Sequence, residues 1–353
     1  MREGQPILEN VDVVICGAEE SSDWDNFVQR CPGTTVCHLF HWRSIIHGAY
    51  GHRPIYLMVT SGKRVRGVLP LFLVKSWIFG RSLASMPFLD YGGACADSPE
   101  VARILLTQAT GLLKEVGANY LEIRQCDPLV EPGAARLDKV SMILDLSSGI
   151  GRLWQSLPAK VRNQVRKAEK SRLKVIYGGA ELLDEFYPVF SANMRDLGSP
   201  VHDLGFFTHT FAHFGGQAEL AIIRDGRRAV GGLVSLYFKD TVLIPWASSL
   251  REYFPKCPNN LLYWEAIMRA SERGCTQFDF GRSSVDSGTY HFKQQWGAKP
   301  LQIYWQTLTS SGETRSLSPA DSSKFQLATE VWKRLPVSIT TLIGPRVRKY
   351  ITQ

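Results

Sequence analysis

The chain has 353 residues, 44% hydrophobic residues and a net charge of +8, which suits two globular domains and excludes wholesale disorder, collagen-like repeats and disulfide miniproteins. No apolar run approaches the roughly 20 residues of a membrane-spanning helix, and the first residues lack an apolar signal segment. Seven cysteines without a CxxC pair predict reduced thiols in a cytoplasmic protein, with no metal site. The basic surplus predicts a phosphate-bearing partner.

The first clear pattern along the chain is a hairpin at 54–76, and it returns at 218–240. Each copy has an apolar strand, a turn that ends in glycine, a basic pair, a second glycine and another apolar strand. Gly62 and Gly67 therefore match Gly226 and Gly231.

The similarity continues downstream of both hairpins. An amphipathic helix at 101–116 precedes Gly117 and an apolar strand, and a second helix at 260–273 precedes Gly274 and a similar strand. Chance similarity of two hairpins is the alternative interpretation. Agreement across hairpin, helix, glycine and strand favours a duplication, and predicts two tandem α/β units.

A basic segment at 152–175 connects the two units. Its apolar residues recur at helical spacing, and the other faces carry lysine and arginine, so we expect one basic connector helix. Such a face is either simply solvated or contacts phosphate. The apolar stripe consists of Trp154, Leu157, Val161, Val165 and Ala168.

The C-terminal region reads as a polar linker followed by an apolar segment with basic ends. Two alternatives are open for the stretch Phe325 to Ile351: it rests on an anionic membrane surface, or it docks on its own domain. The expected division is 1–148 for the first domain, 149–312 for the connector and second domain, and 313–353 for the linker and tail.

The segment 279–297 is the best candidate for chemistry, because it is dense in polar and aromatic residues after a strand. Lys293 lies between Phe292 and Gln294, where partial desolvation would let it meet an anion or a developing oxyanion. A surface lysine beside core aromatics is the alternative. Familiar nucleotide, hydrolase and zinc motifs are absent, and the pair His38 and His41 favours local packing over metal binding.

Several neighbouring residues are further candidates. Arg282 and Tyr290 are placed to hold a phosphate or carboxylate, and Asp279 or His291 to accept the proton of an amine. In the first unit, Asp90-Tyr91-Gly92-Gly93 is either a plain turn or part of a site.

The segments DFGR at 279–282 and GTYHFKQQWG at 288–297 resemble the Fem-type aminoacyltransferases, and more closely the FemAB-related proteins of exopolysaccharide and PEP-CTERM systems with a BioF-like acetyltransferase domain. The resemblance extends over most of the chain. It implies an α/β (α+β) fold of two tandem GNAT-like domains, each a mixed sheet flanked by helices. It also places Lys293 at a reaction centre, and Asp90 and Tyr91 on the acceptor side. Tyr290 and Asp279 are the further catalytic candidates beside Lys293.

The chain departs from ordinary GNAT domains in the loop before its second helix. The residues 251–260 replace the glycine-rich loop that cradles the coenzyme A pyrophosphate. Asn259 or Asn260 would cap the helix and Lys256 would add charge, so an anion site remains an expectation, with a plain cap as the alternative.

Together these features predict an N-acyl- or aminoacyltransferase without a tightly bound cofactor or metal. The co-substrate would be an acyl-CoA, an acyl carrier or an aminoacyl-tRNA, and the acceptor an amine, such as an amino sugar or lipid-linked saccharide. Peripheral contact with an anionic membrane at the inner face is a further expectation, and DNA is not an expected partner. The alternative is a non-catalytic protein that binds nucleic acid or an anionic membrane through its basic helix and tail.

Overall fold

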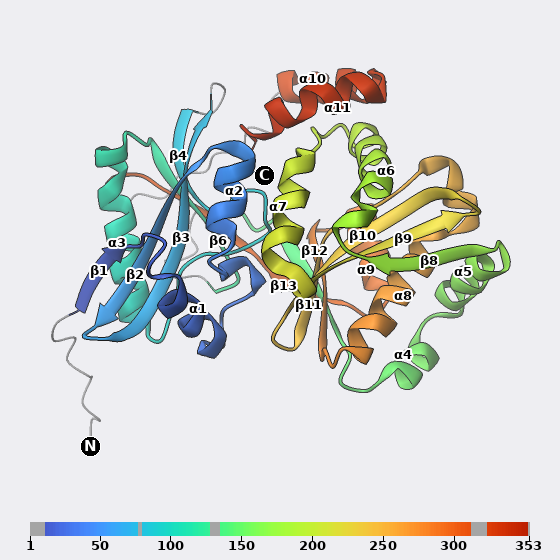
Figure 1. Ribbon diagram of the computed structural model, residues 1–353, viewed down its shortest axis with the longest axis horizontal. Coiled ribbons are helices and arrows are strands. Elements are labelled where there is room, and N and C mark those ends of the chain that lie inside the picture. Colours follow the sequence, from blue (N-terminus) through green and yellow to red (C-terminus); the bar gives the residue numbers. More distant parts are fainter. Residues whose placement is uncertain (1–10, 77–79, 128–134, 312–322, 352–353) are drawn as a thin grey trace.

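The computed structural model describes residues 11–76, 80–127, 135–311 and 323–351 and contains two seven-stranded mixed sheets side by side (Figure 1). The first sheet contains β1 (Val11–Ile15), β2 (Arg53–Ser61), β3 (Arg64–Ser76), β4 (Gly80–Ser85), β5 (Cys95–Ala96), β6 (Tyr120–Gln125) and β14 (Tyr304–Leu308). The second contains β7 (Lys139–Asp145), β8 (Leu173–Gly178), β9 (Ala218–Asp225), β10 (Arg228–Phe238), β11 (Thr241–Ser249), β12 (Gln277–Ser284) and β13 (Lys299–Gln302).

Helices cover both sheets (Figure 1). The helices are α1 (Ser21–Arg30), α2 (Trp42–Tyr50), α3 (Pro99–Val116), α4 (Ile150–Ser156), α5 (Ala159–Lys170), α6 (Leu183–Asp196), α7 (Leu204–Phe214), α8 (Pro258–Glu272), α9 (Gly288–Gln294), α10 (Ser323–Arg334) and α11 (Val337–Arg348). Short 3-10 turns are η1 (Val36–His38), η2 (Ala180–Leu182), η3 (Gly215–Gln217) and η4 (Arg251–Lys256).

The two sheets repeat one topology, as the sequence predicts. In the first, β2, β3 and β4 pair antiparallel in succession, and α3 returns the chain to β6, which pairs parallel with β4. In the second, β9, β10 and β11 pair in the same way, and α8 returns the chain to β12, parallel with β11. The likeness extends upstream, where β1-α1-α2 corresponds to β8-α6-α7. The predicted tandem GNAT-like architecture is therefore confirmed.

The matched glycines occupy equivalent backbone positions. Gly62 and Gly226 lie in two-residue hairpin turns with φ of 57° and 61°, a left-handed conformation that favours glycine. The second strand of each hairpin contains a β-bulge one residue before its matched glycine, which is Gly67 in β3 and Gly231 in β10. A Cβ on Gly67 would lie 2.8 Å from a methyl group of Val101, so close packing requires glycine there.

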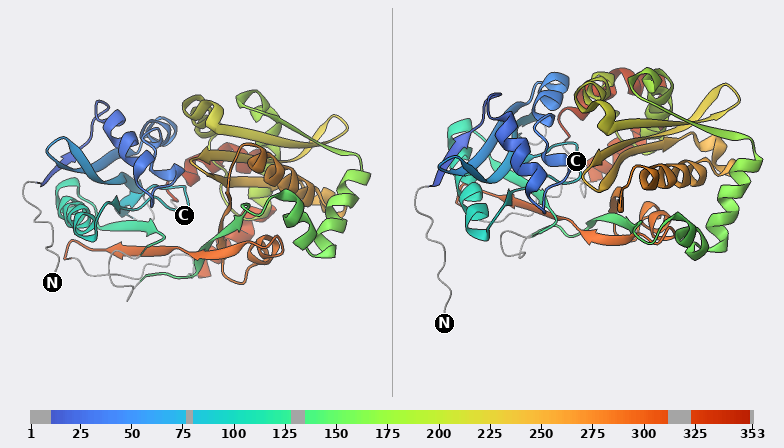
Figure 2. Two further views of the ribbon diagram at one scale, coloured as in Figure 1. Left: turned by 90° about the horizontal axis from the view of Figure 1, so that it is seen from below. Right: turned by 60° about the horizontal axis from the view of Figure 1, so that its bottom comes forward.

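The two sheets exchange one strand each. Strand β7, which follows the first unit in sequence, pairs with β12 in the second sheet, while β14 pairs with β6 in the first. The continuous β13–β14 segment runs along both sheets, as the orange ribbon in Figure 2 shows. The structural units therefore interlock, and the expected boundary between 148 and 149 is crossed in both directions by paired strands.

The units also share a core where α2 packs against α7. The rings of Trp42 and Phe214 lie 5.1 Å apart, and the Tyr50 hydroxyl lies 2.7 Å from Nδ1 of His202. One cluster of buried side chains includes residues of both sheets. The two units are therefore packed against each other through α2 and α7.

The predicted single connector helix is wrong at one point. It is divided into α4 and α5 because Pro158 forces Leu157 into an extended conformation, with φ of −62° and ψ of 142°. After the break, Val161 and Val165 are buried and α5 packs against α8, so the apolar stripe is confirmed there.

The tail docks on its own protein through α10 and α11, which both contact α6 (Figure 1). Arg195 Nη1 donates to the carbonyl oxygen of Leu335 at 3.0 Å, and His52 Nε2 lies 2.9 Å from the carbonyl oxygen of Lys349. The docked alternative is therefore what the structure shows. Most of the predicted linker, 312–322, lies outside the described residues. None of the described helices is long and apolar enough to cross a membrane.

Candidate active site

The candidate site lies where strands β11 and β12 separate. They pair in parallel only from Thr241 to Leu243 and from Gln277 to Asp279. Immediately beyond, β11 contains a bulge at Ile244 and Pro245. Such a separation exposes backbone groups of both strands, and the loop after β4 of the first unit meets β12 at this point.

Asp90 and Tyr91 of that loop bind β12 directly. The backbone N–H of Arg282 donates to Asp90 Oδ2 at 2.9 Å, and Asp90 Oδ1 lies 3.5 Å from Arg282 Nε. The Tyr91 hydroxyl donates to Asp279 Oδ2. The first unit thus supplies two polar side chains to strand β12 of the second unit. Tyr91 and its partner Asp279 are 188 positions apart in the chain.

Asp279 is the buried centre of this network, with 1% of its surface exposed. Its Oδ1 accepts hydrogen bonds from the Ser141 hydroxyl at 2.5 Å and from the Gly281 N–H at 2.8 Å. Burial raises the pKa of Asp279, whereas these donors and Tyr91 act in the opposite direction. Both carboxylate oxygens of Asp279 are therefore engaged by groups of the protein.

Gly281 allows the close approach of the two units. Its φ is +73°, and a Cβ there would lie 2.9 Å from the carbonyl oxygen of Ile244 and 3.0 Å from Asp90 Oδ2. A larger residue would displace Asp90 or the backbone of β11. The left-handed backbone and the close packing therefore explain why the DFGR segment has glycine at position 281.

Lys293 lies on α9, with 7% of its surface exposed. Its Nζ donates to the carbonyl oxygens of Gly281 and Arg282 at 2.8 and 2.9 Å. Burial lowers the pKa of Lys293 to about 8, although Asp90 and Asp279 favour the charged form. A buried lysine whose pKa is lowered by burial, near carboxylates that favour its charged form, is typical of functional sites.

A group of arginines borders the same junction. The guanidinium groups of Arg124 and Arg282 lie 4.4 and 5.0 Å from the ring centre of Trp305 on the exchanged strand β14. Burial lowers the pKa of Arg282, and its Nη1 is buried without a hydrogen-bond partner among the described residues. Neither Arg124 nor Trp305 belongs to a motif that marks it in the sequence, and the strand exchange is what brings them together here.

The other predicted residues are distributed differently. Tyr290 lies partly buried on α9, its ring packed against the second core, whereas His291 is exposed on the same helix. Lys256 forms an ion pair with Asp225, so its charge is already neutralised within the second unit. These three residues therefore do not join the hydrogen-bond network around Asp279.

The expected capping role of the two asparagines is wrong. Helix α8 begins earlier, at Pro258, because Cys257 adopts a left-handed conformation with φ of 58° and proline suits the first helical position. Asn259 Oδ1 accepts from the Ser249 hydroxyl at 2.8 Å, and buried Asn260 donates to Gln164 at 3.2 Å. Asn260 thus fixes α5 to α8 within the second unit.

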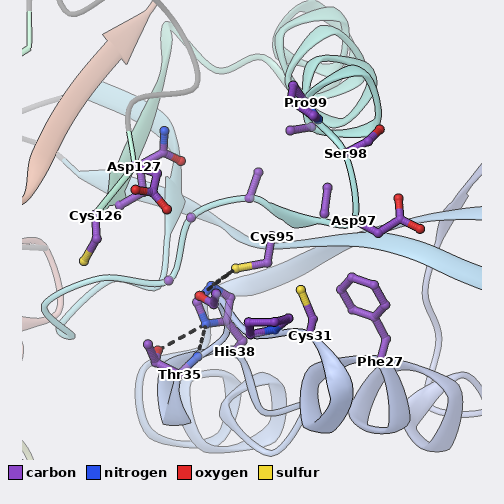
Figure 3. Close-up of a pocket in the computed structure, with 18 of the residues that line it drawn as sticks. Phe27, Cys31, Thr35, His38, Cys95, Asp97, Ser98, Pro99, Cys126 and Asp127 are labelled. Carbon is purple, nitrogen blue, oxygen red and sulfur yellow. Dashed lines mark hydrogen bonds between the residues drawn. The ribbon is translucent and has the colours of Figure 1, made fainter. Parts of the chain in front are cut away.

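A cavity of about 940 Å³ opens in the first unit and reaches the site at Tyr91. It is bounded by α1, the start of α3 and the end of β6, and Figure 3 shows the side chains that line it. Sequence patterns do not reveal this cavity, because its walls come from segments that are far apart along the chain. Its polar lining includes Thr35, His38, Cys95, Gln125 and Asp127.

His38 is a neutral hydrogen-bonding residue in this cavity. Its Nδ1 accepts from the backbone N–H of Thr35 at 3.0 Å, and its Nε2 lies 3.2 Å from Cys95 Sγ (Figure 3). Burial lowers the pKa of His38 to about 4 and raises that of the Cys95 thiol. With Nδ1 as the acceptor, the proton lies on Nε2, so the histidine cannot take a proton from the thiol. No group of three metal-ligating side chains occurs within the described ranges.

Comparison with known families and structures agrees with this architecture. The Acetyltransferase (GNAT) domain family matches residues 156–294, which include α5, α8, β12 and Lys293. No curated protein sequence matches the chain significantly.

Three solved structures show the same fold at low sequence identity. The crystal structure of FemX is 15% identical with a TM-score of 0.66, and the alignment covers 83% of this chain and 96% of FemX. The C-terminal domain of a putative lysylphosphatidylglycerol synthetase from Agrobacterium fabrum is 13% identical, with a TM-score of 0.56 and coverage of 89% and 96%. A tandem GNAT protein from the clavulanic acid biosynthesis pathway is 13% identical, with a TM-score of 0.54 and coverage of 85% and 99%. The chain therefore has the tandem, Fem-type GNAT fold and carries an acyltransferase domain.

Proposed function

We propose that this chain transfers an acyl or aminoacyl group from an activated donor to an amine at the junction of Tyr91, Asp279 and Lys293. One observation carries the proposal: Lys293 is buried as a hydrogen-bonded cation where β11 and β12 separate, within an acetyltransferase-type domain. A purely structural role would not require a charged group there, since burying it costs free energy.

The reaction needs an electrostatic partner for the carbonyl oxygen. The amine nitrogen forms a bond to the carbonyl carbon, and the bond from that carbon to the sulfur or oxygen of the donor breaks. An ammonium has three N–H groups, and two of those on Lys293 bind Gly281 and Arg282. We assign the third N–H group of Lys293 to the developing oxyanion or to the leaving group. The leaving group takes up a proton as it departs.

The amine must also lose a proton. We assign this route to Tyr91, whose hydroxyl donates to Asp279. As the Tyr91 oxygen accepts the proton of the amine, its own proton moves to the carboxylate, whose raised pKa suits it to hold one. Asp90 keeps Arg282 and the backbone of β12 in place, and it is a positioning residue.

The substrates enter from two sides in this proposal. The cavity next to Tyr91 takes the acceptor, and an amino sugar or lipid-linked saccharide of exopolysaccharide or envelope synthesis is the class that we propose. The donor is an acyl-CoA, an acyl carrier or an aminoacyl-tRNA. Arg282 and Trp305 would hold an anionic group of either substrate, because both have a buried N–H without a partner in the described part of the chain. Tyr290 remains a proposed catalytic residue, and His291, Lys256, Asn259 and Asn260 remain proposed substrate- or donor-binding residues.

Peripheral contact with an anionic membrane is part of the same proposal, because a lipid-linked acceptor lies at a membrane. The resemblance in fold to a putative lysylphosphatidylglycerol synthetase is compatible with such an acceptor. A non-catalytic binding protein would use its basic faces and would leave the buried Lys293 and its carboxylates without a role.

A donor and acceptor panel tests the proposal. The purified protein is incubated with acyl-CoA thioesters, aminoacyl-tRNAs and a set of amines that includes hexosamines, and products are followed by mass spectrometry. We expect an acceptor whose mass increases by the acyl group, with release of the free donor carrier. Formation of the same product at the same rate by Lys293→Met would contradict the proposal.

A further inference from the structure

The tail exposes an apolar and basic surface although it is docked. On α10, Leu327 and Val331 are 67% and 54% exposed, and on α11, Ile339 and Leu342 are 43% and 71% exposed. Each pair is followed one turn later by an exposed arginine. We call this surface the tail face; it consists of Leu327, Val331, Arg334, Ile339, Leu342 and Arg346.

The opposite sides of both helices hold them on the protein. Gly198 of the second unit lies against α10, since a Cβ there would be 3.1 Å from Lys333 Cε. On α11, Gly344 packs against Val201, and Arg348 Nε lies 3.3 Å from Nε2 of His202. Both helices dock through these sides on α6 and the segment after it, at the edge of the molecule (Figure 1), and the exposed residues of the tail face lie on their other sides.

This concentration of exposed apolar side chains is unusual for the molecule. The described residues include ten large hydrophobic side chains that are exposed, and four of them belong to the tail face. A fifth, Leu197, is 58% exposed beside Gly198, where α10 docks. Scattered exposed leucines need no explanation, but a gathered set on one element indicates an interaction surface.

The apolar surface continues into a groove between α11 and α6. The groove has a volume of about 690 Å³, and its walls include Pro188, Leu204, Val337, Leu342 and Arg346. It is mostly apolar, and its charged lining residues are Arg346 and Asp203.

Charge decides which partner fits the tail face. The segment 323–351 contains six basic residues, of which Arg348 is buried on the docked side, and one acidic residue, Glu330, which pairs with Lys333. Arg334 and Arg346 are exposed beside aliphatic residues, so their guanidinium groups can reach phosphate while the leucines enter the acyl boundary. A surface that binds a protein usually has a polar rim with charges of both signs around its apolar centre. The tail face is aliphatic and positively charged, and an anionic bilayer complements such a surface.

We propose that the tail face is a docking surface for an anionic phospholipid bilayer. The inference rests on the membrane contact proposed above and is independent of the acyl-transfer chemistry. The docked tail would be the form that binds, so no unfolding of α10 or α11 is required. Binding depends on both apolar insertion and charge, and it weakens as salt rises.

Co-sedimentation of the full chain with vesicles tests this proposal. The vesicles are made of neutral phosphatidylcholine alone or with added phosphatidylglycerol. We expect binding to the anionic vesicles that decreases with salt, and roughly tenfold weaker partitioning for the double variant Leu327→Ser and Leu342→Ser. Leu301→Ser is the matched control, because Leu301 is 42% exposed on β13 and away from the tail.

Two further arms separate the possible failures. Lys293→Met should bind vesicles like the wild type, so a chain that binds membranes without transferring acyl groups would refute only the chemistry. Unchanged vesicle binding by the double variant would overturn the proposal. The proposal would also be overturned if the chain did not bind vesicles and instead formed a concentration-dependent dimer that the double variant abolishes. That result would assign the tail face to a second copy of the chain. Circular dichroism of each variant confirms that the fold is retained.

Discussion

Replacing Lys293 by methionine removes a charge from the interior while keeping an unbranched side chain of similar length. In the folded protein burial lowers the pKa of this lysine to about 8, from an ordinary value of 10.5. The unfolded chain therefore binds more protons than the folded chain between about pH 8 and pH 10.5. Stability attributable to this group rises with pH in that window, because the folded state is relieved of a buried charge.

The size of the effect follows from the two pKa values. Their difference corresponds to about 3 kcal/mol at most, all of it a destabilisation of the folded state at and below pH 7. The conversion is reasonable for this side chain, since only 7% of its surface is exposed. A lysine that destabilises the fold by this amount fits a functional role.

Urea denaturation at pH 7, 8, 9 and 10 measures the effect. The wild type should gain up to about 3 kcal/mol relative to Lys293→Met as the pH rises through this range. Lys299→Met, which replaces an exposed lysine on β13, should follow the wild type at each pH. Parallel stability curves for the wild type and Lys293→Met would refute the view that Lys293 is held as a buried ammonium.

Three other changes test separate contacts. Tyr91→Phe should lower turnover by about 10²-fold without loss of fold, because it removes the proposed proton route through Asp279, and initial rates measure it. Gly281→Ala should lower the free energy of unfolding by about 2 kcal/mol or more, because it combines a left-handed backbone with a close contact at Asp90, and urea denaturation measures the loss. Gly226→Ala is the control, since a Cβ there would meet open space, and it should lower the free energy of unfolding clearly less. Equal losses for the two variants would contradict the packing argument. Arg348→Met should speed proteolysis within the tail, because its contact with His202 helps to dock α11; an unchanged cleavage rate would show that other contacts suffice.

Local sequence patterns predict the elements of the fold well. Turn glycines such as Gly62 and Gly226 and the helix ends at Gly117 and Gly274 act through local backbone geometry, which short spacings reveal. The strand exchange could not be predicted, because pairing of β14 with β6 depends on contacts between residues far apart in sequence. Helical spacing also misleads at Leu157, where the apolar stripe continues through a proline that ends the helix.

The composition of the sequence predicts the second-unit half of the candidate site, whereas Asp90 and Tyr91 of the first unit are indicated by the family resemblance. The density of polar and aromatic residues in 279–297 indicates Lys293 and Asp279. In the structure Tyr91 donates to Asp279, and Asp90 and Asp279 favour the charged form of Lys293. Arg124 and Trp305 carry no motif and come together only through the exchanged strand. The expected cap at Asn259 or Asn260 is wrong because an αL conformation at Cys257, which no side-chain preference signals, starts α8 earlier.

The most direct test of the proposed chemistry is the turnover of Lys293→Met compared with Lys299→Met, measured with the best donor and amine acceptor from the panel. Loss of a cation that stabilises charge in the transition state should lower the turnover of Lys293→Met by about 10²- to 10³-fold, whereas Lys299→Met should turn over like the wild type. For the wild type, turnover should also fall as the pH rises above about 8, where Lys293 loses its proton. Full activity of Lys293→Met, with an unchanged pH profile, would contradict the assignment of the reaction to this junction.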